Sequence, residues 1–450
     1  MSALVSLTPR YPGQFLRRVA ARDGWQRLQF FGELKAAHGD LVRFGAGALS
    51  VVLVSHPDDI REVLVNQHKA MHKGRALERA KMLLGEGLLT SEGEFHLRQR
   101  RLVQPAFHRQ RIAAYAGTMD AAARVVDARW KDGQALDVHA EMMALTLAIV
   151  AGTLFDADVS DDTNEVAEAL EAAFQAVSLG FGFGPFAAVL DRLPLPSRRR
   201  FFRAKTKLYA IIDRIVADRR RTGEDRGDLL SMLLSAQDDE GDGTGMSDEQ
   251  LRDEAITLFI AGHETTANAL TFAWLLLARH AEARQRLEAE VDAVLGDRAP
   301  TMDDLARLPF TRAVMAETMR LYPPAYIVGR RAVAPVELRG TTFPVDTIFV
   351  QSQWLVHRDP RWWPEAEAFR PERWLDEAAA AARPKMAYFP FGAGTRICVG
   401  EQFAWMEAMI CLAVLARRWR VEVPGPDPAL EPIITLRPRG GLAGVVRRRS

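Results

Sequence analysis

The sequence predicts a mainly α-helical fold with a small β portion, and two observations support this prediction. One stretch, from about Ser247 to His280, keeps a helical pattern over more than 30 residues, without proline and with the single glycine Gly262. A helix of that length crosses most of a domain, and Ser247, followed by Asp-Glu, is suited to cap its start. Patterns typical of strands are, by contrast, short and few.

Apolar periodicity and turn residues predict the remaining elements. Further helices are expected where apolar residues recur at helical spacing: Pro57 to Asn66, Arg98 to Asp132, Ala135 to Phe155 and Ser197 to Arg221. The second of these is expected to be broken near Pro105. Leu41 to Phe44 and Ser50 to Val54 flank a glycine turn and predict a hairpin. Other strands are expected at Val336 to Leu338, Thr347 to Val350, Ile433 to Leu436 and Gly444 to Val446. The β portion is therefore expected to be split between the two ends of the chain.

Composition narrows the class of protein. The chain has 450 residues and a net charge of +1, which gives no general attraction to nucleic acid or to anionic membranes. Two cysteines, Cys398 and Cys411, are too few for a disulfide framework and fit a reducing compartment. The longest apolar run, Met142 to Phe155, is shorter than the roughly 20 residues that span a bilayer. A soluble, cytoplasmic protein without a membrane span is expected.

The segment from Phe391 to Gly400 reads Phe-Gly-Ala-Gly-Thr-Arg-Ile-Cys-Val-Gly. Its glycines, Gly392 among them, allow tight turns and the close approach of a flat ligand. Cys398 precedes a helical pattern that begins at Glu401, and the N-terminus of a helix stabilises a thiolate. Taken alone, Cys398 could also be a buried structural cysteine in a turn. Cys411 is expected to be a packed core thiol.

Two further motifs carry charge. Ala-Gly-His-Glu-Thr-Thr, from Ala261 to Thr266, places an acid and an alcohol near the middle of the long helix. If the helix is buried, an unpaired Glu264 carboxylate there would be costly. An ordinary polar patch on an amphipathic helix is the alternative. Glu317 and Arg320 are three residues apart on one helical face, and a surface ion pair is the plain interpretation of that spacing. Phe-Arg-Pro-Glu-Arg-Trp, from Phe369 to Trp374, follows later in the chain.

Taken together and in this order, these motifs resemble those of the cytochrome P-450 family, and the resemblance runs from about Leu41 to the C-terminus. It implies a cytochrome P-450 fold, with residues 1–450 forming a single triangular haem domain without a fused reductase. It implies haem b as cofactor, with Cys398 as the ligand of the iron. Phe391 would pack beside the sulfur.

The same resemblance assigns the other site residues. Arg396, His96, Arg100 and Arg330 would meet the haem propionates, with Arg331 a competitor of Arg330. Many family members have tryptophan where this chain has His96. Thr265 would form a hydrogen bond with the iron-bound oxygen, and Glu264 would be part of the proton supply. His263 is expected to be a packing or surface histidine. A buried, structural triad is implied for Glu317, Arg320 and Arg373.

The resemblance places mostly apolar segments at the substrate: Leu83 to Leu89, Phe181 to Phe186, Leu258, Ala261, Ala325, Tyr326, Ile327, Ile433 and Ile434. For each of these, core packing is the alternative. Some relatives hold a fatty-acid carboxylate with a basic residue and a tyrosine in the first hairpin, and Ala46 to Val54 contains neither. Terpenoids, polyketides, steroids and alkanes therefore fit better than fatty acids.

The function implied is monooxygenation, by hydroxylation or epoxidation of a hydrophobic small molecule with O₂. No flavin or iron–sulfur domain is visible, so electrons are expected from a separate ferredoxin or flavodoxin with its reductase. A basic face of Arg98, Arg101, Arg109 and Arg111 would receive that partner, unless it is only a solvated helix face. Two alternatives are a peroxide-using or redox-neutral haem-thiolate enzyme, whose relatives usually lack the acid–alcohol pair, and a non-catalytic haem sensor.

Overall fold

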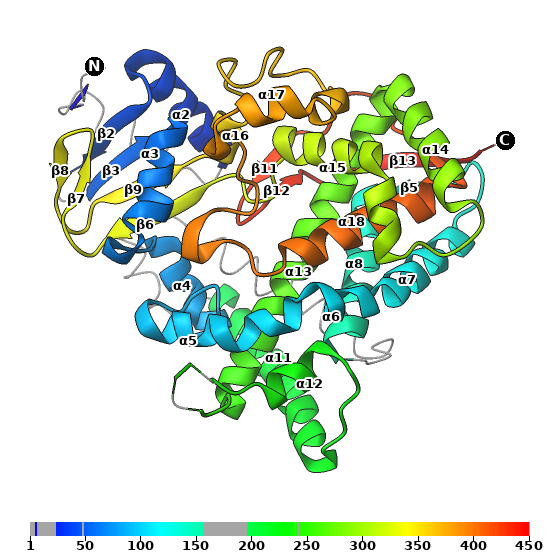
Figure 1. Ribbon diagram of the computed structural model, residues 1–450, viewed down its shortest axis with the longest axis horizontal. Coiled ribbons are helices and arrows are strands. Elements are labelled where there is room, and N and C mark those ends of the chain that lie inside the picture. Colours follow the sequence, from blue (N-terminus) through cyan, green and yellow to red (C-terminus); the bar gives the residue numbers. More distant parts are fainter. Residues whose placement is uncertain are drawn as a thin grey trace.

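The computed structural model describes residues 5–6, 24–46, 49–155, 196–238, 240–241 and 243–449 (Figure 1). The stretch from Phe181 to Phe186, expected near the substrate, lies outside the described residues. Helices dominate, as predicted. The α-helices are α2 (Gly24–His38), α3 (Pro57–Arg61), α4 (Arg75–Leu84), α5 (Gly93–Val103), α6 (Arg109–Ala114), α7 (Ala116–Arg129), α8 (Val138–Phe155), α11 (Pro196–Thr222), α12 (Leu229–Ser235), α13 (Asp248–Arg279), α14 (Ala281–Leu295), α15 (Pro309–Leu321), α16 (Gln353–Val356), α17 (Glu377–Ala382) and α18 (Glu401–Ala416).

Short helical turns connect many of these helices. The first is a π-helix and the others are 3₁₀: η1 (Glu62–Asn66), η2 (His68–Ala70), η3 (Gln104–Phe107), η4 (Met302–Arg307), η5 (Pro371–Trp374), η6 (Lys385–Ala387) and η7 (Gly394–Arg396). The break predicted near Pro105 is confirmed, because η3 separates α5 from α6 there. In the described part of the chain, no helix is both long enough and apolar enough to cross a membrane.

Helix α13 runs through the middle of the molecule (Figure 1). Ser247 caps it in a reciprocal arrangement, in which the Gln250 backbone N–H donates to Ser247 Oγ and the Ser247 N–H donates to Gln250 Oε1. Most of its residues are buried, since α8, α11, α15 and α18 pack around it. The predicted helix from about Ser247 to His280 is therefore confirmed, and its middle turns lie inside the protein.

One sheet gathers strands from both halves of the chain. Its order is β1-β2-β3-β9-β6-β4. The bounds are β1 (Val5–Ser6), β2 (Leu41–Ala46), β3 (Leu49–Val54), β4 (Met71–Lys73), β6 (Val328–Ala332) and β9 (Ile348–Gln351). The predicted hairpin is β2 and β3, which pair antiparallel with Phe44 opposite Val51. The strands fall mainly near the two ends of the chain, as expected, and the pairing of β3 with β9 joins the two groups in one sheet.

Smaller sheets complete the β portion. They contain β5 (Ala135–Asp137), β7 (Val336–Leu338), β8 (Thr341–Phe343), β10 (Trp419–Glu422), β11 (Leu430–Pro432), β12 (Leu436–Pro438) and β13 (Ala443–Arg448). The helix expected from Ala135 was wrong at its start, because residues 135–137 pair with β13. The strand expected from Ile433 to Leu436 was also wrong. Residues 433–435 are the turn between β11 and β12, in which the Ile433 N–H donates to the Thr435 carbonyl (3.0 Å).

Candidate active site

Cys398 lies in a tightly turned loop directly before α18. Its backbone N–H donates to the carbonyl of Phe391 (2.9 Å), so the loop folds back on itself. Gly392 and Gly394 have φ angles of 76° and 68°, in the left-handed region that favours glycine. A Cβ atom on Gly394 would lie 2.3 Å from the Leu64 carbonyl oxygen. Only glycine therefore allows this loop to pack against η1.

Cys398 is exposed at one side of the loop, although many protein groups surround its thiol. Burial raises the pKa of the Cys398 thiol, while the Gly400 backbone N–H and the positive charges of Arg100 and Lys73 act in the opposite direction. Gly400 is the cap residue of α18, so the predicted placement of Cys398 just before a helix is confirmed. Cys411 is fully buried within α18, as predicted for a core thiol.

Two arginines fix the cysteine loop to α5 and to the turn before it. Arg100, on α5, donates from Nη1 to the Ile397 carbonyl (2.7 Å). Arg396, in the loop, donates from Nη1 to the Ser91 carbonyl (2.8 Å) and forms an ion pair with Glu92. Burial lowers the pKa of both guanidinium groups. Both residues thus contact or belong to the cysteine loop.

His96 lies on α5, one turn before Arg100, and is buried. Its Nδ1 is 3.3 Å from Ser91 Oγ. Its Nε2 is buried and makes no hydrogen bond of normal geometry within the part of the chain that the structure describes. Burial, helped by the charges of Arg396 and Lys73, lowers the pKa of His96 to about 3. The imidazole is therefore neutral, and one of its nitrogens is open to a further partner.

The two neighbouring arginines of β6 have different surroundings. Arg330 is buried, and burial together with Arg396 lowers its pKa to about 10. Arg331 forms ion pairs with two carboxylates nearer the surface, Glu78 (2.8 Å) and Asp346 (2.9 Å). Side chains alternate between the two faces of a strand, so only one of this pair can face the cysteine loop. The structure places Arg330, not Arg331, among the charges around the loop.

Sequence analysis missed Lys73, which is buried at the end of β4. Its Nζ donates to the carbonyls of Leu88 (3.5 Å) and Leu89. Burial lowers the pKa of Lys73 well below its usual value, and the charges of Arg396 and Arg330 lower it further. No motif contains this lysine. Only the pairing of β4 with β6 brings it to Arg330.

Four basic residues, with the neutral His96 beside them, form what we call the cation cluster: Lys73, Arg100, Arg330 and Arg396. Glu92 is the carboxylate that pairs with Arg396. Burial raises the pKa of Glu254, another acid near Lys73, to about 8. The cluster therefore has an excess of positive charge at neutral pH, in a place where unpaired charge is costly. A haem, which carries two carboxylates, fits this excess and the accessible thiol of Cys398.

The acid–alcohol motif lies at the middle of α13, as predicted. A Cβ atom on Gly262 would lie 3.0 Å from Val150 Cγ2, so α8 approaches this turn closely. Ala261 is exposed and Thr265 is partly exposed, although the neighbouring turns of α13 are buried. The Thr265 hydroxyl donates to the Ala261 carbonyl (2.7 Å). This turn thus has an accessible face that carries an alcohol.

Acidic and basic groups flank that face. Glu264 is buried, and its Oε1 accepts a hydrogen bond from the Thr435 hydroxyl (2.7 Å). His263 is also buried, with Nε2 3.1 Å from the Met143 carbonyl, and burial lowers its pKa to about 4. His263 faces α8, so of the two expectations, a packing or a surface histidine, the first is correct. Burial raises the pKa of Glu407, on α18 beside Thr266, to about 8.

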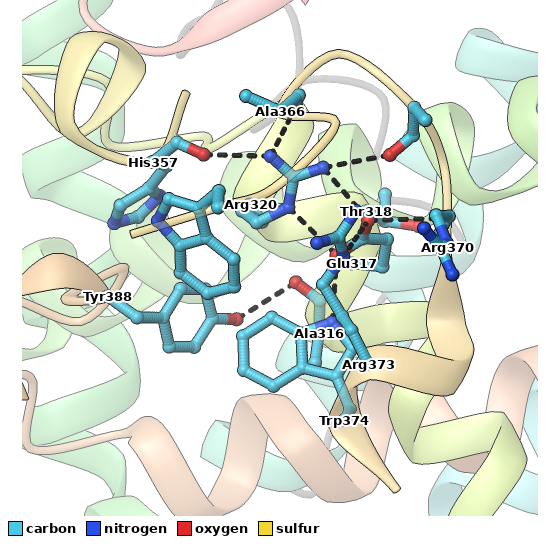
Figure 2. A network of polar contacts seen from close by, with 12 residues as sticks. Ala316, Glu317, Thr318, Arg320, His357, Ala366, Arg370, Arg373, Trp374 and Tyr388 are labelled. Atoms are coloured by element: carbon cyan, nitrogen blue, oxygen red, sulfur yellow. Dashed lines mark hydrogen bonds and ion pairs between the residues drawn. The ribbon is translucent and has the colours of Figure 1, made fainter. Parts of the chain in front are cut away.

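The three residues of the charge triad are in contact, with Glu317 and Arg320 buried and Arg373 partly buried (Figure 2). Arg320 donates from Nε and Nη2 to the two oxygens of Glu317, both at 2.8 Å, and neither side chain is exposed. Arg373 Nε adds a bond of 3.0 Å to Glu317 Oε1. Sequence analysis missed two further donors to this carboxylate, the Trp374 indole N–H (2.8 Å) and the Arg370 backbone N–H (2.9 Å).

The triad is connected to the chain segment that leads to the cysteine loop. Arg320 also donates to the His357 carbonyl (2.8 Å), and His357 Nε2 accepts from the Phe389 N–H (3.0 Å). The Tyr388 hydroxyl donates to the Ala316 carbonyl (3.1 Å) (Figure 2). Because residues 388–389 lie just before the loop, the network around Glu317 fixes where the loop starts.

The apolar residues that the resemblance assigned to the substrate come from separate segments. Leu258 and Ile434 pack against one cluster together with Leu83, Leu84 and Leu88. Ala325 is exposed, and Ile327 and Ile433 are partly buried. Tyr326 is 4% exposed and donates its hydroxyl to the Ile433 carbonyl (2.6 Å), so it supports the turn between β11 and β12 from the core.

The basic face expected on α5 and α6 is smaller than the sequence suggested. Arg101 forms a two-point contact with Asp238 (both 2.8 Å), and Arg98 lies 3.7 Å from the same carboxylate. Asp238 belongs to the loop that follows α12, and no motif linked that loop to α5. Arg109 and Arg111 remain exposed, with Arg109 3.8 Å from an exposed carboxylate of η4.

Comparisons with known proteins agree on one family. A sequence model described as cytochrome P-450 matches residues 13–442. Cyclooctatin synthase from Streptomyces melanosporofaciens is 42% identical, over 91% of this chain and 89% of that protein. Cyclooctat-9-en-7-ol 5-monooxygenase from the same organism is 40% identical (89% and 87%), and pentalenene oxygenase from Streptomyces avermitilis is 38% identical (90% and 89%).

A solved structure gives the same result for the fold. The crystal structure of a cytochrome P-450DA haem domain superposes with a TM-score of 0.86 at 26% sequence identity. The match covers 99% of this chain and 97% of that one. The predicted fold class, mainly α with a small β portion, is confirmed.

Proposed function

This chain belongs to the cytochrome P-450 family, and from that premise we propose that it is a haem-thiolate monooxygenase of a terpenoid substrate, with Cys398 as the ligand of the iron. One observation carries the proposal. An accessible thiol lies beside a buried excess of positive charge, the combination that a dicarboxylate haem with a thiolate ligand requires.

The family fixes the coarse chemistry. The protein is a haem-containing monooxygenase that uses O₂, a hydrophobic small molecule and a redox partner. We propose haem b as the form of the cofactor, because the cation cluster would bind its two carboxylates. We also propose a ferredoxin or flavodoxin, with its reductase, as the source of electrons. A single haem domain over residues 1–450 and a cytoplasmic location remain proposals; the two unpaired cysteines suit a reducing compartment.

The chain's own residues would hold the cofactor at several points. Cys398 would bind the iron as a thiolate, helped by the Gly400 N–H and by the charge of Arg100. The cation cluster would bind the two carboxylates, and Phe391 and Gly392 shape the loop around the sulfur. When bound through a thiolate, haem supplies the activation of dioxygen.

Proton delivery is assigned to Glu264 and Thr265. A general acid must lie within hydrogen-bond reach of its target, directly or through one water. The Thr265 hydroxyl lies at the accessible face of α13 and holds its proton toward the Ala261 carbonyl. Glu264, the adjacent residue, is a buried carboxyl that can pass protons inward. This pair favours an O₂-dependent enzyme over one that uses peroxide.

A terpenoid substrate is supported by the apolar lining and by the relatives. Leu258, Ala261 and Ile434 offer no polar group that would orient a carboxylate or a sugar. The three relatives above are named for cyclooctatin, cyclooctat-9-en-7-ol and pentalenene. Apolar side chains would exclude water and hold the substrate by shape, which suits a rigid cyclic hydrocarbon.

The first test is the ferrous–CO difference spectrum of the purified wild-type protein. A strongly red-shifted Soret band is expected, because a thiolate donates electron density to the iron. Terpenoids are then screened by their spin-state shift, with fatty acids as the comparison. A CO spectrum like that of a histidine-ligated globin would refute the proposed function.

Arg330→Leu should weaken haem retention, whereas Arg331→Leu should not. Removing one partner of a buried charge pair costs about 2–5 kcal/mol, so haem should leave Arg330→Leu at least tenfold faster. Arg331 forms surface ion pairs, whose loss typically costs only about 0–1 kcal/mol. Transfer of haem to apomyoglobin measures both rates. Equal rates in the two variants would contradict the assignment of Arg330 to a propionate.

A further inference from the structure

The turn between β11 and β12 brings a threonine to the acid of α13. Thr435 is 7% exposed, and its hydroxyl donates to Glu264 Oε1 at 2.7 Å. Asn268, one helical turn beyond Glu264, donates from Nδ2 to the same hydroxyl oxygen at 3.1 Å. The single hydroxyl proton of Thr435 is thus directed at the carboxylate, while Asn268 occupies the oxygen.

The chain of contacts continues toward the surface. Asn268 is fully buried, and its Oδ1 lies 3.0 Å from His139 Nε2. A carbonyl oxygen can only accept, so His139 donates this bond. His139 lies in the first turn of α8 and is partly exposed. Three elements, α8, α13 and the turn, therefore hold the Glu264 carboxyl through one directed set of hydrogen bonds.

The turn itself is firmly held. The Ile433 carbonyl accepts from the Tyr326 hydroxyl (2.6 Å), and the Leu436 N–H donates to the Pro324 carbonyl (2.9 Å). Ile433 and Ile434, directly before Thr435, are among the residues proposed to line the substrate site. One short segment therefore carries both substrate contacts and the partner of the acid.

We propose that Thr435 is a positioning residue for Glu264, which it holds in the orientation from which this carboxyl supplies protons to the Thr265 side of α13. The proposal rests on the proposed function of the acid–alcohol pair and adds to it the group that keeps the acid in place. Asn268 fixes the Thr435 hydroxyl, and His139 fixes Asn268. A buried carboxyl without such a donor would turn toward any other available partner.

The test compares Thr435→Val, which keeps the shape and removes the hydroxyl, with Thr435→Ser, which keeps the hydroxyl. In Thr435→Val the fraction of electrons that reaches product should fall by about tenfold, less than the factor of about 10²–10⁴ that a general acid contributes. Peroxide release should rise, while the substrate concentration at half-maximal spin shift stays within twofold of wild type. Thr435→Ser should restore coupling to within twofold.

A second measurement does not depend on turnover. Midpoints of thermal unfolding are determined for Thr435→Val, Glu264→Leu and the double variant, and the two shifts should not be additive, because the residues are in direct contact. Thr271→Val is the matched control. Its buried hydroxyl donates to the Ala267 carbonyl (2.7 Å), about 10 Å along the helix from Glu264. Its shift should add to that of Glu264→Leu.

Wild-type coupling in Thr435→Val, or additive shifts in the Thr435–Glu264 cycle, would overturn the positioning role. Uncoupling that Thr435→Ser fails to restore would overturn it as well. Thr265→Ala tests the proposed function apart from the positioning role of Thr435. Unchanged coupling in that variant would refute the acid–alcohol assignment. The unfolding cycle would then still decide whether Thr435 holds Glu264.

Discussion

Glu317→Leu is expected to lower the free energy of unfolding by about 3–5 kcal/mol, because it leaves the fully buried guanidinium of Arg320 without its counter-charge. The Arg373 and Trp374 side chains lose the same acceptor. In a chain of 450 residues this corresponds to a fall of about 3–5 °C in the unfolding midpoint. Thermal unfolding followed by circular dichroism measures it.

Glu249→Leu is the matched control for that substitution. Glu249 and Arg252 have the same spacing of three residues on a helix, but Glu249 is 78% exposed and the two groups are 3.4 Å apart. Loss of such a pair is expected to cost less than about 1 kcal/mol. If Glu317→Leu were no more harmful than Glu249→Leu, the buried triad would not be what stabilises the segment that leads to the cysteine loop.

Cys398→His is expected to abolish oxygenation and to replace the red-shifted ferrous–CO band by one typical of histidine ligation. The sulfur is the group that makes a thiolate-ligated haem competent in O–O cleavage. The fold should survive, since Cys398 is accessible and its backbone, not its side chain, donates to Phe391. Absorption spectra of the ferrous–CO complex and product analysis check both parts.

Cys411→Ala provides the comparison, because Cys411 is the other cysteine of the chain. It is fully buried in α18, so removing the sulfur leaves a small cavity and costs about 1 kcal/mol. The red-shifted band and the activity should remain. A band that persisted in Cys398→His but disappeared in Cys411→Ala would reassign the ligand.

The cysteine loop and the long helix were predictable because each is a local pattern. Glycines at 392 and 394 meet a backbone requirement that belongs to the loop itself, and the cap at Ser247 depends only on the three residues that follow. The spacing of Glu317 and Arg320 is also local. That this pair is buried depends on residues 357–374, and only the resemblance implied it.

Other site features depend on contacts between distant segments. Lys73 reaches the cation cluster because β4 pairs with β6, and Thr435 reaches Glu264 because a turn near the C-terminus folds onto α13. Neither residue lies in a motif, although Thr435 directly follows two residues that the sequence had singled out. The choice between Arg330 and Arg331 needed the face of a strand, which the sequence of a five-residue strand does not fix.

The pairing of β3 with β9 means that the large sheet can be completed only late in the synthesis of the chain. Val51 lies opposite Ile348, so nearly 300 residues separate the two strands along the chain. At about 5–20 residues per second, a ribosome needs roughly 15–60 s to make that stretch. During this interval the uncharged strand Leu49–Val54 has no neighbour on one side. An open apolar edge of this kind invites pairing with other chains, so the nascent hairpin is where aggregation would begin.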